Sequence, residues 1–162
     1  MGSHQYHPWG CCFGQFLPDP STPNGLIAGF WADLAPNASG EIKYETSGEE
    51  NRRLVISFES VPLWDDTNET ATDFQIVLFE NTNNFEVRIG EVSSGGGLAT
   101  IGYENLDGTD GLSLFHGDDI LLQETAYHFT ARDEFGNGWD AGGPIGASNL
   151  EAIDNGTLLD LG

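Results

Sequence analysis

The chain has 162 residues, of which 26 are acidic and five are lysine or arginine, so its net charge is −21. A field of this sign repels nucleic acid and anionic membrane surfaces, which excludes both as partners. No apolar run comes near the length of about 20 residues that a membrane span needs. We therefore expect a chain that folds in water as one domain with a hydrophobic core.

The apolar residues fall in short runs, many of them with a period of two, which is typical of β-strands. Glycine occurs 22 times, and an excess of glycine indicates many turns. In chain order the runs predict strands at residues 26–34, 41–46, 52–61, 74–80, 85–89, 99–105, 112–115 and 125–132. The first of these also permits a short helical turn around Phe30 and Trp31.

Particular strands carry more detailed predictions. The alternation of 41–46 predicts a half-buried strand, and residues 62–73 are predicted to form a loop. Residues 74–80 are apolar on both faces, which indicates a central strand, and 85–89 closes a hairpin with it.

We therefore predict an all-β fold, an antiparallel sandwich or jelly roll of about eight strands with little helix, in a single domain over 1–162. The segment 1–23 is broken by prolines and is expected to be extended. The segment 133–162 is rich in glycine and aspartate, and only 158–161 is expected to add a strand there.

Several stretches resemble the nidogen-like extracellular β-domains of bacterial secreted and surface proteins. The resemblance covers about residues 10–116, with its motifs in the same order. The similar stretches are Gly10–Pro18 (GCCFGQFLP), Pro23–Leu34 (PNGLIAGFWADL), Gly40–Thr46 with Asn51–Ile56, Phe74–Glu80 with Asn83–Glu86, and Ala99–Asn105 with Asp107 and Gly108.

The resemblance implies a non-catalytic extracellular β-domain and assigns no ligand. Further strands usually precede the double cysteine in that family, and none is found here. A missing strand would leave an open sheet edge, onto which another chain can pair. The acidic segment from Asp133 onward is not part of the family pattern.

Two acidic turns are candidate calcium sites, because Ca²⁺ prefers carboxylate, amide and carbonyl oxygens on flexible loops. The first contains Asp107 and Asp110. The second and better candidate contains Asp133, Glu134, Asn137 and Asp140. The alternative is that both are ordinary turns of the Asp-Gly or Asn-Gly kind.

Trp64 and Trp139 lie in polar, aspartate-containing loops and are candidate sugar-binding residues, since exposed aromatic rings stack on sugar rings. The alternative is that each ring covers an edge of the core.

Cys11 and Cys12 are adjacent, so they form a vicinal disulfide, stay as free thiols or bridge to another chain. With His4 and His7 they also make a weak candidate for a transition-metal site. The pairs Asp65/Asp66 and Asp118/Asp119 are the only candidate catalytic carboxylates, and pairs are expected by chance among 26 acids.

These observations predict a secreted or cell-surface structural or adhesive module that is not an enzyme, is stabilised by calcium and self-associates through a sheet edge. Its expected partner is a protein or polysaccharide of the cell surface or matrix. One alternative is a carbohydrate-binding module of a secreted hydrolase. A second is a filament subunit that donates residues 1–23 as a strand to the next subunit.

Overall fold

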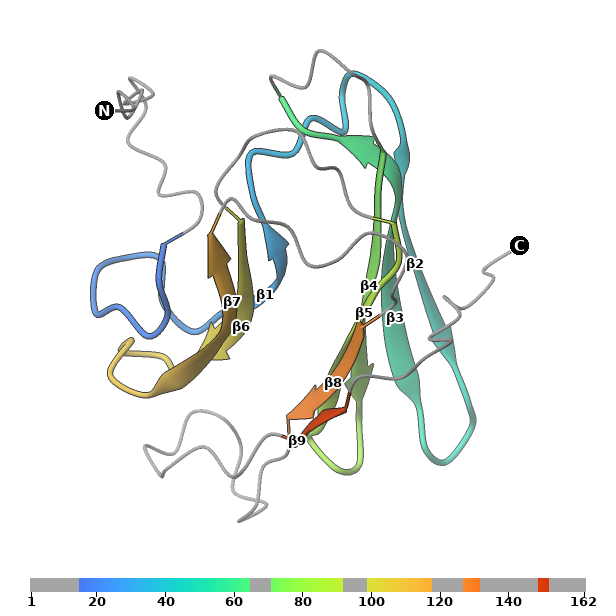
Figure 1. Cartoon of the computed structure of the whole chain (residues 1–162). Helices are drawn as coiled ribbons and strands as arrows, with labels where there is room; N and C mark the ends of the chain where they lie inside the picture. The colour runs from blue at the N-terminus through green and yellow to red at the C-terminus, as the bar shows by residue number, and fades with distance from the viewer. Residues whose placement is uncertain (1–14, 65–70, 92–98, 118–126, 132–148, 152–162) are drawn as a thin grey trace.

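The computed structural model describes residues 15–64, 71–91, 99–117, 127–131 and 149–151. These residues form nine strands in two antiparallel sheets (Figure 1), which confirms the all-β prediction. The small sheet has the order β1-β6-β7 and the large sheet the order β2-β3-β4-β5-β8-β9. The strands are β1 (Ile27–Trp31), β2 (Glu41–Ser47), β3 (Arg53–Pro62), β4 (Ala71–Phe79), β5 (Phe85–Ile89), β6 (Ala99–Glu104), β7 (Gly111–Gly117), β8 (Tyr127–Ala131) and β9 (Asn149–Glu151).

The predicted strands are present, but the start of β4 and the number of strands differ from the prediction. β4 begins at Ala71, inside the loop expected at 62–73 and three residues before the expected start of the strand, because Ala71 and Thr72 continue the pairing with the end of β3. β9 was not predicted, since three residues carry no periodic signal, and it is held by pairing with β8. The strand expected at 158–161 lies outside the described residues. No helix among the described residues has the length and apolarity to cross a membrane.

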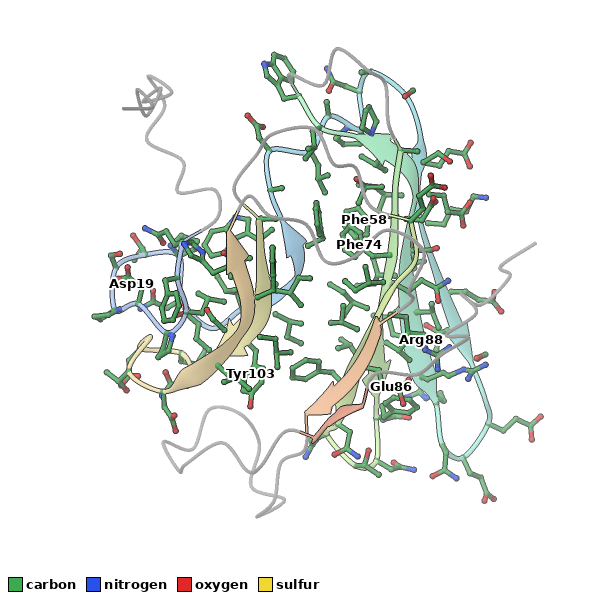
Figure 2. The ribbon with its side chains drawn as sticks, in the orientation of Figure 1. Asp19, Phe58, Phe74, Glu86, Arg88 and Tyr103 are labelled. Carbon is green, nitrogen blue, oxygen red and sulfur yellow. The ribbon has the colours of Figure 1, made fainter. Side chains whose placement is uncertain are left out.

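The hydrophobic core lies between the two sheets, where side chains from both inner faces meet (Figure 2). Phe74 of the large sheet contacts Phe30 of the small sheet, with ring centroids 6.1 Å apart. Phe85 meets Tyr103 edge to face at 5.4 Å. Phe58 stacks on Phe74 at 4.1 Å within the large sheet. Central strands β4 and β5 therefore carry most of the contact between the layers.

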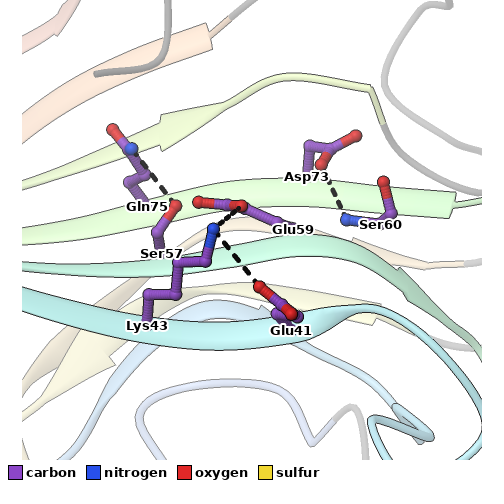
Figure 3. Close-up of polar contacts among 7 residues, drawn as sticks. All are labelled: Glu41, Lys43, Ser57, Glu59, Ser60, Asp73 and Gln75. Atoms are coloured by element: carbon purple, nitrogen blue, oxygen red, sulfur yellow. Dashed lines mark hydrogen bonds and ion pairs between the residues drawn. The ribbon is translucent and has the colours of Figure 1, made fainter. Parts of the chain in front are cut away.

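A β-bulge in β3 changes the register of the large sheet. Phe58 pairs with Phe74, whereas Val61 pairs with Thr72, so β3 holds one extra residue between them. Ser60 takes a φ of 51° there. Its amide donates a 2.8 Å hydrogen bond to the Asp73 carboxylate (Figure 3), which satisfies a backbone donor that the bulge removes from the ladder.

The described part of the N-terminal segment covers the outer face of the small sheet (Figure 1). Leu17 is buried, and its amide donates a 2.7 Å hydrogen bond to the Ser113 hydroxyl. The Thr100 hydroxyl donates a 2.7 Å bond to the Gln15 carbonyl. As expected, Gln15–Pro23 contains no strand or helix. This segment forms a third layer and contributes a side chain to the interior.

Gly29 sets the distance between the two sheets. A Cβ at this position would lie 2.9 Å from both the Ile76 side chain and the Phe74 ring. These two residues belong to the central strand β4, so the backbone of β1 rests directly on the middle of the large sheet.

We predict that Gly29→Ala lowers the free energy of unfolding by about 1–3 kcal/mol, because the added methyl group overpacks the core. Urea unfolding followed by circular dichroism measures the change. Ser39→Ala, in an exposed turn, is the control and should change stability by less than about 0.5 kcal/mol. Equal stabilities for Gly29→Ala and the control would contradict the assigned contact.

Candidate functional site

The small sheet is too narrow to cover the large one. β1, at the edge of the small sheet, lies against β4 and β5. Ile42 and Tyr44 of β2 pair with Phe58 and Ile56 and so share the inner face with the core. They are nevertheless 48% and 79% exposed. The prediction of a half-buried strand was therefore wrong, because β2 extends beyond the small sheet.

Two hollows adjoin along the uncovered side of β1, and we call them together the trough. The first, of about 480 Å³, is lined by inner-face residues such as Thr46, Leu54 and Leu78. The second, of about 370 Å³, is lined by the length of β1 and by Phe58 and Phe74. Ile27 lines both. The trough is mostly apolar, and the Arg52–Glu80 ion pair lies at one end.

The outer face of β2 is charged instead of apolar. The Lys43 ammonium lies 2.9 Å from Glu59 and 3.2 Å from Glu41 (Figure 3). The hydrogen bond to Glu59, and then that to Glu41, raises the pKa of Lys43. Glu45 follows on the same face. β2 is thus an edge strand with an exposed apolar face and a face of alternating charge.

The central strands carry a polar cluster on this outer side. Gln75 is fully buried and donates a 3.3 Å hydrogen bond to the Ser57 hydroxyl. On β5, the Arg88 guanidinium lies 2.8 Å from Glu86 (Figure 2). The first pair joins the neighbouring strands β4 and β3, and the second lies within β5. Both pairs give their polar groups a partner inside the sheet, which indicates a structural role.

The first predicted calcium loop is a turn between β6 and β7 whose polar groups bond to one another. The Asp107 carboxylate accepts hydrogen bonds from the amide and hydroxyl of Thr109. The hydroxyl bond, followed by the amide bond, lowers the pKa of Asp107. The Asn105 side chain accepts bonds from the amides of Thr109 and Asp110. The structure thus brings Asp107 and Asp110 into one turn, where protein donors already engage Asp107.

No group of three or more His, Cys, Asp or Glu side chains placed to hold a metal ion occurs in the part of the chain that the structure describes. The second predicted calcium loop, with Asp133, Glu134, Asn137 and Asp140, lies outside the described residues. Calcium binding therefore stays a prediction for both loops.

Of the other predicted site residues, Trp64 lies within the described residues and the rest lie outside them. Trp64 follows β3 and is 57% exposed, as a ligand-binding ring must be. Trp139, Cys11, Cys12 and the two aspartate pairs Asp65/Asp66 and Asp118/Asp119 lie outside the described residues.

A buried carboxylate lies beneath the N-terminal segment. Glu104 is only 6% exposed. Its Oε2 accepts a 2.9 Å hydrogen bond from the Asp19 amide, and its Oε1 has no partner among the described residues. Burial raises the pKa of Glu104, against the lowering effect of the Asp19 amide. Nearby, the hydroxyl of Ser21 and then its amide lower the pKa of Asp19.

Sequence reasoning missed both β2 as an exposed edge and the trough beside it. A signal for the edge was present, since Glu41, Lys43 and Glu45 alternate along one short strand. Charged residues, lysine above all, are common on edge strands, where they discourage uncontrolled pairing. The trough had no such signal, because it depends on how the sheets overlap.

A family model described as NIDO related, that is, nidogen related, matches residues 8–128, well over half of the chain. The matched span includes the stretches that carry the resemblance seen in the sequence, and it contains β1 to β7. Comparison with curated proteins and with solved structures finds no match.

We predict that Glu104→Gln raises the free energy of unfolding at pH 7 by about 1 kcal/mol, because it removes a poorly solvated charge and keeps an oxygen for the Asp19 amide. A raised pKa in the folded state means that folded wild-type protein binds protons more readily than unfolded protein. Wild type should therefore gain stability as the pH falls through the folded pKa of Glu104, and the advantage of the variant should shrink.

Chemical denaturation at several pH values between 7 and 4 measures this difference. Glu49→Gln, in the exposed loop between β2 and β3, is the control and should match wild type within about 0.5 kcal/mol. A Glu104→Gln protein that is less stable than wild type at pH 7 would contradict the prediction, because it would mean that the groups around Glu104 stabilise its ionised carboxylate.

Proposed function

Because the chain belongs to the NIDO-related family, whose domains are non-enzymatic extracellular modules, we propose that it is a secreted or surface-bound structural or adhesive module. In this proposal it performs no catalysis and associates with protein through an uncovered strand edge. The self-association of such modules would build or cross-link an extracellular assembly.

The exposed inner face of β2 is the observation that carries this proposal. Tyr44 is 79% exposed and Ile42 48% exposed. Thr46 on the same face of β2, and Phe58 opposite Ile42, line the apolar trough. An edge that no described strand pairs, with apolar side chains beside it, offers both backbone hydrogen bonds and buried area to a partner. A soluble domain that exposes such an edge has a surface suited to association.

Calcium stabilisation is part of the same proposal. A chain with 26 acids and five lysine or arginine residues repels itself, and a bound divalent cation reduces that repulsion. The turn with Asp107 and Asp110 and the segment with Asp133, Glu134, Asn137 and Asp140 supply the oxygen ligands that calcium prefers.

Carbohydrate binding is the second candidate function, and the exposure of Trp64 favours it. An exposed indole can stack on a sugar ring, with Trp139 as a second candidate ring. Retention on insoluble polysaccharide, lost on Trp64→Ala, would favour this function over association with protein.

The contacts of the N-terminal segment within its own molecule bear on the filament alternative, in which residues 1–23 are donated to a neighbour. Leu17 is 1% exposed and Gln15 bonds to Thr100 within the same molecule. A strand donated from this part of the segment to a neighbour would first have to give up these contacts.

We expect sedimentation velocity of the purified chain to show reversible, concentration-dependent association at about 0.15 M salt, where the Debye length of about 8 Å screens its negative charge. A monomer at all concentrations from micromolar to millimolar would contradict self-association.

We also expect calcium to raise the stability of the folded chain. Ligand at a hundredfold excess over its dissociation constant stabilises the folded state by about 2.7 kcal/mol. Thermal unfolding in chelator and then in millimolar calcium measures the shift, with magnesium as the control. Equal midpoints in chelator and calcium would remove calcium from the proposal.

A further inference from the structure

β2 has one edge that no described strand occupies. It pairs with β3 over all seven of its residues, Glu41 to Ser47, and stands first in the strand order of the large sheet. In an antiparallel ladder the hydrogen-bonding groups of alternate residues point to opposite sides of the strand. β2 therefore presents a row of backbone donors and acceptors on the side away from β3.

The sequence of β2 is complementary to itself in one antiparallel register. If Tyr44 of one molecule lies opposite Tyr44 of another, Lys43 lies opposite Glu45 and Ile42 opposite Thr46. The Lys43–Glu45 pair occurs twice, because the arrangement has two-fold symmetry. All seven residues of the strand are paired, and no two like charges stand directly opposite each other.

Registers shifted by two residues lack this complementarity. Centring the pair on Lys43 places Lys43 opposite Lys43 and Glu41 opposite Glu45. Centring it on Glu45 places two Glu45 carboxylates opposite each other. Like charges directly opposed across strands are destabilising. Centring the pair on Ile42 also opposes Lys43 to Glu41, but it pairs only the first three residues of β2. The charges and the number of paired residues together therefore favour the register centred on Tyr44.

We propose that two copies of this chain associate through β2, antiparallel and centred on Tyr44, so that their large sheets join into one continuous sheet. This inference rests on the proposed function and specifies its partner, a second copy, and its surface. Charge complementarity between the two β2 strands identifies that partner.

The same register brings the exposed apolar residues together. Ile42 and Tyr44 face the same side as the core residues Phe74 and Ile76. The two-fold axis passes through the Tyr44 pair and places both inner faces on one side of the joined sheet. The Tyr44 rings and Ile42 side chains would then form one apolar strip, continuous with the trough of each molecule.

The first test uses charge exchange, with the dimer dissociation constant measured by sedimentation velocity at about 0.15 M salt. K43E and E45K each place like charges opposite one another, and each should weaken association by roughly tenfold. The double variant K43E/E45K restores opposite charges across the two-fold axis and should return association to within about threefold of wild type. This recovery is expected even though the double variant loses the contacts of Lys43 with Glu41 and Glu59 inside each molecule.

The second test avoids those internal contacts. Y44K places two ammonium groups at the two-fold axis and should weaken association by at least about tenfold. L106K is the matched control, because Leu106 is also an exposed apolar residue, 64% exposed, and lies away from β2. It should leave association unchanged. Thermal unfolding and circular dichroism of each variant establish that it is folded.

The outcomes separate this inference from the proposed function. Weakening by the single variants with recovery in the double variant supports the β2 dimer. Association of wild type that neither K43E nor Y44K alters, or weakening without recovery in the double variant, overturns the β2 register and leaves an association through another surface. A wild-type chain that stays monomeric overturns the β2 dimer and self-association together.

Discussion

The close approach of β1 to the middle of the large sheet is the constraint on which the rest of the structure depends. Gly29 allows the backbone of β1 to rest on Ile76 and Phe74, and Phe30 and Tyr103 then reach Phe74 and Phe85. With β1 held over β4 and β5, the two other strands of the small sheet extend away from β2. The core is therefore dense over the central strands and open beyond β1, where the trough lies.

This off-centre packing gives the strands of the large sheet different environments. β4 and β5 are covered on the inner face, and their outer faces carry satisfied polar pairs such as Gln75 with Ser57 and Arg88 with Glu86. β2 has the same alternation of apolar and polar residues and is exposed on both faces. An exposed apolar edge favours uncontrolled pairing. Alternating charges on the opposite face of the strand restrict that pairing to registers in which opposite charges meet.

The N-terminal segment gives the small sheet a second covered face. Leu17 is buried there, and Glu104 is buried with it although only one of its oxygens has a partner among the described residues. Covering Glu104 costs the hydration of a carboxylate. The contacts of Gln15, Leu17 and Asp19 offset that cost, since together they hold the segment against β6 and β7. In this layer the polar residues serve the fold more directly than they serve a ligand.

The sequence by itself determined eight of the nine described strands, the antiparallel all-β class and the family. An alternation with a period of two indicates which residues share a face, and turns rich in glycine and asparagine indicate where strands end. It also placed Trp64 on an exposed loop and Asp107 and Asp110 in one turn. Only the tertiary structure decided which strands share a sheet, that the described N-terminal segment forms a third layer, and that β2 lies beyond the small sheet with both faces exposed. The reason is physical: Glu41–Ser47 alternates like a half-buried strand, and alternation cannot tell whether another layer lies over the apolar face. That depends on the overlap of two sheets of unequal width, which contacts between residues far apart in the chain determine.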